Sequence, residues 1–497
     1  MTGTEAITTK RWKPRLWQMI VCAIVFVLLA CFVALLVVRA NGRARWFAYV
    51  EAEQAAGRPI TTDYFTVHTP LLDRAVQKAW DSWATGFAST PTGGARPAYR
   101  VASTSQNLSA TLAKHRPAWD AWVTGHGPLP DAVPKLIADA EMDLQPALIV
   151  LRTDKLVLSR FGWAGEPRTI GMSGLHGPLP FVYTLRGPNG SNEPMLAEWL
   201  HHHAVLSDDP SQDLADLDAL HRALDRPAIA HDAQVAITVA RIRDRTYLAL
   251  AIRDRLPAAA RERWLEEASR AVELAGDSLL GERITTPNEI ATLIDRGLIR
   301  FLNTHIGNWW SWSSPGQCAT LTWIWATGWD SLPQIASFTG QAAASLRSDP
   351  PVPFPDFAEL KADLSWFGRF NLAPKMEFLF SHTLRPSLEQ EAGHRQAQLA
   401  VRILALMRSS GLPTDQADLL ARVGDAQALL VRQNRFTLRY ERPAPDRFRL
   451  VIDPASPIPD FDDPRNMPEH TKAAGSPPST SPLTTEPFIE IQVPPTP

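Results

Sequence analysis

The sequence has few cysteines, and their positions exclude two classes of site. Only three occur in 497 residues, and Cys22 and Cys31 both lie in an apolar run near the N-terminus. Cys318 is left without a partner in the rest of the chain. An internal disulfide framework and a cysteine-based zinc site are therefore both excluded.

An excess of charge of one sign is also lacking. The formal net charge is -2, and no long basic block occurs outside the flanks of the N-terminal apolar run. Proteins that bind nucleic acid neutralise phosphates with a basic surface. We therefore expect no nucleic-acid partner.

Recognisable catalytic motifs are missing as well. There is no P-loop, no complete G-x-S-x-G, no H-E-x-x-H and no dinucleotide-binding glycine fingerprint. The segment beginning at Gly171 (Gly-Met-Ser-Gly-Leu) lacks the final glycine of a nucleophile elbow, so Ser173 is interpreted as a loop serine. The sequence favours a non-enzymatic protein and predicts no cofactor.

One long apolar run is present, from Leu16 to Val38. Its 23 residues would span about 34 Å as a helix, enough to cross a bilayer core of roughly 30 Å. Tryptophan and basic residues flank both ends, as at membrane interfaces: Trp12, Trp17, Lys10, Arg11, Lys13 and Arg15 before it, and Arg39, Arg43, Arg45 and Trp46 after it. No second uninterrupted apolar stretch of this length follows, which predicts a single-pass protein with the lipid bilayer as a partner.

Two alternatives for this run are less favoured. A cleaved signal has an apolar core of about 7–15 residues, which is shorter than this one. The tetrapeptide ending at Cys31 resembles a lipobox, but the apolar run continues beyond it. The basic N-terminal tail predicts insertion in the cytoplasmic (inner) membrane with the soluble body on the extracytoplasmic side, although three arginines follow the run closely.

The predicted fold class is mainly α: an N-terminal transmembrane helix, an irregular antiparallel helical array, a small C-terminal β-hairpin and a disordered tail. The first helix should continue past the membrane to Gly57-Arg-Pro, a typical helix stop. Apolar spacing predicts further helices at 71–87, 195–206, 211–224, 230–255, 258–280, 375–407 and about 419–430. Short strands are predicted at 147–151 and 156–158.

These elements divide the chain into eight segments. They are a basic tail (1–15), the transmembrane helix (16–38), a membrane-proximal helical region (39–130), a mixed region with short strands (131–193), the helical array (194–283), a Trp-rich helical region (284–395), a helix with the β-hairpin (396–452) and a disordered Pro-rich tail (453–497).

Alternation of apolar and polar residues predicts the hairpin, with Phe436, Leu438 and Tyr440 on one strand and Phe448, Leu450 and Ile452 on the other. In the last segment, 12 of 45 residues are proline, a composition typical of disorder. Within it, Phe488 to Val493 alternates again. This piece is interpreted as a tail fragment, or alternatively as a strand that joins a partner's sheet.

Two Glu-x-x-His pairs are the candidate metal ligands: Glu198 with His201, and Glu391 with His394. Such pairs on helices supply ligands in di-iron bundles, but about half of one pair is expected by chance in a chain of this composition. Consecutive helical residues point about 100° apart, so the run from His201 to His203 is interpreted as a solvated helix face. We expect no metal site.

Six tryptophans cluster in the Trp-rich region: Trp309, Trp310, Trp312, Trp323, Trp325 and Trp329. Indole rings stack on sugars and lie at lipid interfaces, but they also fill protein cores. Core packing is the favoured interpretation, and a ligand-binding cluster is the alternative.

Several blocks together resemble an uncharacterised group of large single-pass bacterial envelope proteins. They are the helix end at 46–59, the array at 194–283, and the block at 397–452, which resembles the C-terminal module of pseudopilins. The turn at Gly411-Leu-Pro is one residue shorter than in pseudopilins, prolines interrupt the acidic loop that follows, and the pilin-type processing signal is absent. The resemblance implies an envelope protein but no activity or catalytic residue.

The expected function is a helical scaffold or interaction protein of the envelope, with a protein partner for its helical body. Two alternatives come from other classes. One is a carbohydrate- or lipid-acting enzyme that uses the Trp-rich region, and the other is a metal-dependent oxidase built on the Glu-x-x-His pairs.

Overall fold

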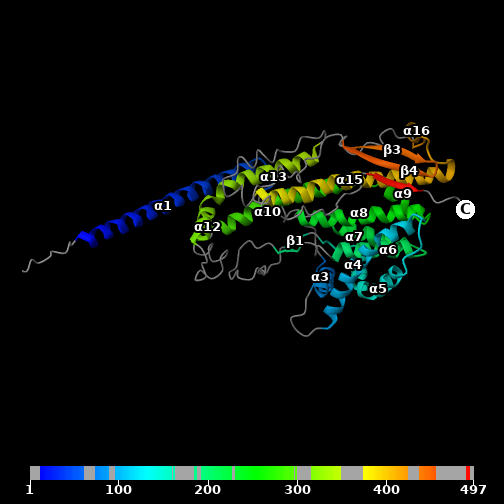
Figure 1. The fold of residues 1–497 in the computed structure, drawn as a ribbon, viewed down its shortest axis with the longest axis horizontal. Coiled ribbons are helices and arrows are strands. Elements are labelled where there is room, and N and C mark those ends of the chain that lie inside the picture. The colour runs from blue at the N-terminus through cyan, green and yellow to red at the C-terminus, as the bar shows by residue number, and fades with distance from the viewer. Residues whose placement is uncertain are drawn as a thin grey trace, which may run out of the picture.

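A computed structural model of the chain shows one long helix joined to a helical body (Figure 1). The structure describes residues 12–60, 73–88, 96–158, 160–162, 184–186, 192–225, 230–295, 297–298, 315–348, 373–423, 436–454 and 488–492. Over these residues the fold is mainly α, as predicted, with a small antiparallel sheet near the C-terminus.

Helix α1, Trp12–Ala55, is the most extended element. Its 44 residues correspond to about 66 Å of continuous helix. Among the described helices it is the one long and apolar enough to cross a membrane, and its apolar window is not buried at all by the rest of the protein. The predicted end is confirmed: Gly57 adopts a φ of 69°, and the Arg58 amide donates to the Glu53 carbonyl at 2.9 Å, closing the last turn.

The second half of α1 belongs to the body. Residues on one stripe turn inward at intervals of three or four, which is one face of a helix: Leu35, Arg39, Gly42, Trp46, Tyr49 and Glu53. Trp46 is fully packed in the same core as the helices of the body. Helix α1 and the body are therefore one continuous packed unit rather than two parts joined by a linker.

The body is an array of helices of uneven length. In chain order they are α3 (Arg74–Ala88), α4 (Arg96–Val123), α5 (Ala132–Leu151), α6 (Asn192–Leu206), α7 (Ser211–Ala223), α8 (Ala230–Ile252), α9 (Ala258–Glu266), α10 (Ala271–Ile294), α12 (Pro315–Thr327), the 3-10 turn η2 (Gly328–Ser331), α13 (Leu332–Arg347), α15 (Ala373–Ser410) and α16 (Gln416–Val423). Helix α8 packs against α6, α7, α10 and α15, so it is the centre of the array.

Three local predictions were wrong. Residues 147–151 end helix α5 instead of forming a strand, and 156–158 carry no strand. The helix predicted at 258–280 is split, because Glu267 adopts an extended backbone after α9. The carbonyl oxygens of Trp264 and Glu267 accept hydrogen bonds from Gln398 of α15, and these tertiary bonds replace helical ones.

The described strands form two antiparallel sheets. Within the predicted mixed region, β1 (Arg160–Gly162) pairs with β2 (Thr184–Arg186), at other positions than the two predicted strands. The predicted hairpin is confirmed as β3 (Phe436–Ala444) and β4 (Arg447–Pro454), with Leu438 opposite Ile452.

The segment predicted to be a tail fragment, or alternatively a strand that joins a partner's sheet, forms β5 (Phe488–Gln492), which pairs antiparallel with β4 of the same chain. Ile491 is buried against the body. Part of the predicted disordered tail is thus a strand of the sheet, while 455–487 lies outside the described residues.

Candidate functional site

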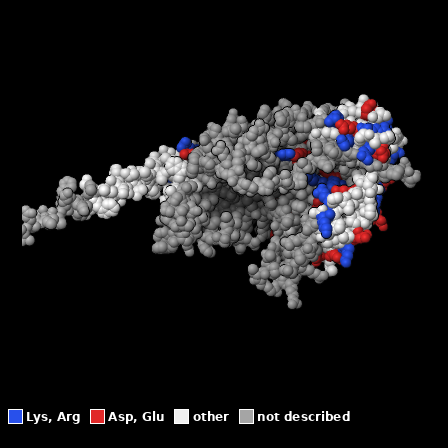
Figure 2. Space-filling view, viewed as in Figure 1, with Lys and Arg blue, Asp and Glu red and all other residues white. Residues whose placement is uncertain are grey.

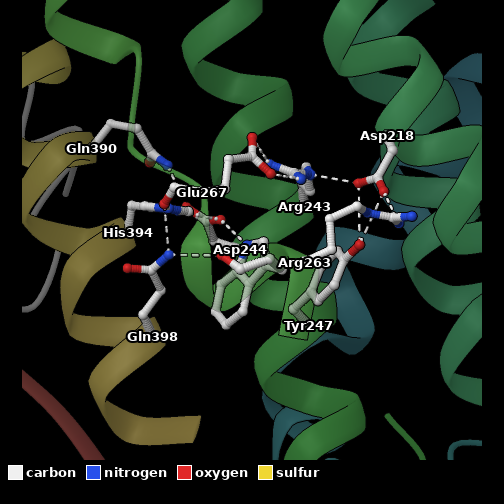
Figure 3. A network of polar contacts seen from close by, with 10 residues as sticks. Asp218, Arg243, Asp244, Tyr247, Arg263, Glu267, Gln390, His394 and Gln398 are labelled. Carbon is white, nitrogen blue, oxygen red and sulfur yellow. Dashed lines mark hydrogen bonds and ion pairs between the residues drawn. The ribbon is translucent and has the colours of Figure 1, made fainter. Parts of the chain in front are cut away.

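The densest group of buried charges lies between α7, α8, α9 and α15 (Figure 3). We call it the polar network. Asp218 comes from α7, and α8 contributes three residues. The α9 region adds three more, and α15 supplies three side chains from the opposite side. Its members are Asp218, Arg243, Asp244, Tyr247, Arg263, Trp264, Glu267, Gln390, His394 and Gln398.

Arg243 lies at the centre of one half of the polar network. Its Nε donates to Asp218 Oδ1 at 2.7 Å, and its Nη1 donates to Glu267 Oε1 at 2.8 Å. Burial lowers the pKa of Arg243, but its contacts with Glu267 and Asp218 outweigh burial, and the net pKa is raised. The guanidinium is therefore permanently charged and bridges two elements.

Asp218 is held by three donors at once. Besides Arg243, it accepts hydrogen bonds from Arg263 Nη2 at 2.7 Å and from the Tyr247 hydroxyl at 3.1 Å. Burial, followed by the charge of Asp218, raises the pKa of Tyr247 to about 12. Tyr247 therefore remains a protonated hydrogen-bond donor at physiological pH.

Asp244 and His394 form the other half. His394 Nδ1 lies 2.8 Å from Asp244 Oδ1, and Asp244 also accepts from Trp264 Nε1 at 3.1 Å and from Gln390 Nε2 at 2.6 Å. Burial opposes ionisation of Asp244, but the charge and hydrogen bond of His394 outweigh it and lower the carboxyl pKa. Asp244 is therefore a carboxylate.

The hydrogen bonds of His394 determine its protonation state. Its Nε2 lies 3.1 Å from the Glu267 carbonyl oxygen, which can only accept, while Nδ1 faces the Asp244 carboxylate. Both ring nitrogens must then carry a proton, so His394 is an imidazolium. Burial lowers its pKa, but Asp244 and the Glu267 carbonyl outweigh this and raise it overall.

The polar network is balanced in charge and closed to substrates. Three carboxylates (Asp218, Asp244 and Glu267) face three cations (Arg243, Arg263 and His394). The adjoining cavity has room for about one water molecule. His394 has no free lone pair to act as a general base. The arrangement joins helices, and it offers no chemistry to a substrate.

The first Glu-x-x-His pair is separated by its partners. Glu198 pairs with Arg245, whereas His201 is buried and points elsewhere. Its Nε2 accepts from Trp119 Nε1 at 3.3 Å, and its Nδ1 lies 3.0 Å from the Thr246 hydroxyl. Burial, with the positive charge of Arg245, places the pKa of His201 well below its usual value, so it is neutral.

The histidine run was predicted to be a solvated face, and this prediction was wrong. His201 and His202 are buried, and only His203 is partly exposed. His202 Nδ1 donates to the Glu198 carbonyl at 2.7 Å, and its ring packs 4.4 Å from that of Trp119. Since α6 is covered on several sides, adjacent residues on it can all be buried.

Both members of the second pair are buried, and His394 belongs to the polar network. Across the described part of the chain, no three side chains of the metal-ligating types lie together as a cation site. The two pairs are not brought to one centre, since each histidine is bonded to other groups.

The tryptophan cluster divides into two kinds of environment. Trp325 and Trp329 are buried against α1, where the Arg39 guanidinium lies 4.3 Å from the Trp325 ring centroid. Trp323 is 46 % exposed. Trp309, Trp310 and Trp312 lie outside the described residues.

Sequence reasoning missed most of the polar network. At the start of a helix, the carboxylates Asp213, Asp216 and Asp218 are expected only to complement the helix dipole, yet Asp216 binds Arg152 and Asp218 binds Arg243. One signal was available: four charged residues lie close together at 241–245 in the helix 230–252, which has apolar residues on every side. Charges in a buried helix indicate buried partners, but not which ones.

Comparison with known proteins identifies no relative: no protein-family model, no curated protein and no solved structure matches the chain.

Proposed function

We propose that this chain is a membrane-anchored interaction protein of the cell envelope, whose helical body presents a docking surface for another protein. The observation that carries the proposal is an apolar stripe on the exposed side of α5. Met142, Pro146 and Ile149 are all exposed, with 76 % of Met142 and 63 % of Ile149 accessible to solvent. Their spacing of four and three residues places them on one face of the helix.

The position of this stripe indicates what covers it. Helix α5 lies on a side of the body that is well away from the exposed half of α1 (Figure 1), so the bilayer that holds α1 does not reach it. Acidic residues (Asp139, Glu141 and Asp143) adjoin the stripe. We infer a protein partner with an apolar centre and basic margins, in keeping with the polar rim of protein interfaces.

The polar network supports the same proposal, because it fixes the shape of the body instead of serving a substrate. It joins α7, α8, α9 and α15, and a rigid array holds the α5 surface in one conformation. A preformed surface loses less entropy on binding than a flexible one.

Photo-crosslinking in intact cells tests the proposed docking surface. A photoreactive residue at position 149 should give one discrete protein adduct, whereas the same residue at Glu262, an exposed site on α9, should not. In the full-length protein, Met142→Lys should abolish the adduct at 149 through charge repulsion with basic margins. No adduct at 149, or the same adducts at 149 and 262, would overturn the proposal.

We further propose that α1 lies in the cytoplasmic membrane with the body on the extracytoplasmic side. The four basic residues that precede the apolar run support this orientation, as does the resemblance to envelope proteins. Protease added outside spheroplasts should digest the body and leave a protected N-terminal fragment. If the body is cleaved only after the membrane is opened, the body lies in the cytoplasm and the proposed orientation is wrong.

A further inference from the structure

The end of the body beside α1 differs from the rest in composition. Residues 301–329 contain no Asp, Glu, Lys or Arg, yet they hold six of the chain's 17 tryptophans. The described part of this stretch forms α12 and the first half of η2, which lie next to α1 (Figure 1). An uncharged, tryptophan-rich sequence of this kind is typical of segments that lie at a membrane interface.

Contacts fix the height of α12 along α1. Arg39 is the first residue after the apolar run, and its Nη1 donates to the carbonyl oxygens of Ile294 at 2.5 Å and Trp325 at 3.3 Å. Its guanidinium also pairs with Asp295 at 3.5 Å. Leu35, one turn earlier and inside the apolar run, is already partly buried against the body. The body therefore reaches the level at which α1 leaves the membrane.

The outer face of α12 carries no charge. Ala319 and Trp323 are both exposed and lie four residues apart, so they share one face of the helix. Trp325, two positions farther along, points inward to Arg39. Figure 2 shows that the described surface of α1 outside the body (white) carries no charge and that charged residues begin where α1 meets the body.

We propose that the body rests directly on the bilayer, with the face of α12 that bears Ala319 and Trp323 embedded in the lipid headgroup layer. The occupant of this face is lipid rather than a second protein, because α12 packs beside α1 at the level of Arg39, where the apolar run ends. Indole rings prefer this layer, since the ring is apolar while the N–H remains hydrated. The inference rests on the proposed anchoring of α1.

Site-directed spin labelling of the full-length protein tests this seating. In a background of Cys22→Ala, Cys31→Ala and Cys318→Ser, single labels are placed through Ala319→Cys and Trp323→Cys. The protein is reconstituted in vesicles of phosphatidylethanolamine and phosphatidylglycerol. Both labels should be accessible to oxygen and shielded from a water-soluble nickel complex, at a depth near the lipid phosphates.

Two controls separate this inference from the anchoring itself. A label on native Cys31, alone, should report the bilayer interior, and a label at Met142→Cys should be freely accessible to the nickel complex. If the label on Cys31 is buried but those at 319 and 323 are as exposed to nickel as that at 142, the anchoring stands and the seating is wrong.

A label on Cys31 that is exposed to nickel would instead overturn the anchoring and the seating together. Labels at 319 and 323 that are shielded from both reagents would show a protein contact, and they would also overturn the seating on lipid. Ala319→Cys retains Trp323, so a folding defect of Trp323→Cys alone does not affect the result.

Discussion

At the scale of single residues, the body is notable for charges buried in pairs. Asp244 on α8 and His394 on α15 are 150 positions apart, and both are almost completely shielded from water. Moving a charge out of water costs several kcal/mol, so each depends on the other and on the surrounding donors. Removing one member should cost far more than removing an exposed ion pair.

His394→Leu should lower the free energy of unfolding by about 3–5 kcal/mol, because it leaves Asp244 charged and uncompensated. Arg116→Ala is the matched control. It removes an exposed ion pair with Asp120 at 4.0 Å and should cost less than about 1 kcal/mol. Chemical denaturation in detergent measures both. Equal losses for the two variants would show that the His394 imidazolium is not needed in the fold.

The stabilising effect of this pair should depend on pH. The pKa of His394 is raised in the folded protein, so its contribution is complete below the unfolded value of about 6.5 and is lost as pH rises through the folded value. Asp244→Asn should therefore lower the free energy of unfolding more at pH 6 than at high pH. A pH-independent effect would contradict the charged state.

His202 should act in the opposite direction. Burial is the main cause that lowers its pKa to about 4. Between about pH 6.5 and 4, His202 is therefore protonated in the unfolded chain but not in the folded protein. Stability should fall over that range by up to about 3 kcal/mol. His202→Asn keeps a donor for the Glu198 carbonyl and cannot titrate. Denaturation at pH 7 and pH 4.5 should show a smaller loss for the variant, and parallel losses would exclude His202 as the cause.

These residue-level features could not be predicted from the chain. The spacing of Glu391 and His394 placed both on one helix, but the partners of His394 come from α8 and from the carbonyl of Glu267. The burial of His201 and His202 depends on Trp119 and Thr246, which belong to other helices. Tertiary packing determines which side chains pair in this way, and these partners cannot be predicted from a single sequence.

At the scale of elements, periodicity was informative where one face alone is buried. The alternation in β3 and β4 predicted the hairpin, and the Gly57 stop predicted the end of α1. The apolar run at 147–151 was misread because a short buried helical segment and a buried strand have the same composition. The exposed Ile149 amid buried neighbours shows the helical period.

Gly42 controls how closely α1 approaches η2. A Cβ at this position would lie 2.5 Å from Asp330 Oδ1 and 3.0 Å from Trp329 Cβ. Gly42→Leu should therefore separate α1 from η2 and destabilise the protein by about 1–3 kcal/mol or more. Hydrogen exchange of η2 amides should increase most.

Gly393→Ala on α15 is the matched control, because nothing lies within 4 Å of its Cβ position. Alanine is the better helix former by about 1 kcal/mol, so this variant should be slightly more stable than the original. If Gly42→Leu leaves exchange in η2 unchanged, the close packing of α1 against η2 is not required for the fold.

Strand β5 covers one edge of the sheet. Truncation before Phe488 should expose the β4 edge, where Arg449 is opposite Glu490, and unpaired edges promote association between chains. Sedimentation of the truncated protein should show new oligomers, and amides of β4 should exchange faster. Ile491→Asp, which disrupts the buried contact without shortening the chain, should have the same effect. If the truncated protein stays monomeric, β5 is not needed to protect the β4 edge.

At the scale of the whole molecule, the two ends of the body have different surfaces. Helix α12 with its uncharged face lies beside α1, while helix α5 with its apolar stripe lies on another side of the body, away from the exposed half of α1 (Figure 1). The sequence predicted the mainly helical fold and the one helix that is long and apolar enough to cross a membrane. It did not predict that one end of the body meets the point where α1 leaves the apolar run, because that depends on Arg39 reaching Ile294 and Trp325.

The continuity of α1 has a mechanical consequence. Transmembrane helices are tilted by about 20° on average from the bilayer normal, and this tilt changes with bilayer thickness. Glu53 of α1 forms ion pairs with Arg58 and with Arg283 of α10, so α1 cannot pivot freely against the body. If α1 spans a bilayer as proposed, a change in its tilt is transmitted as a rotation of the whole body. Bilayer thickness would then set the height of the proposed α5 docking surface above the membrane.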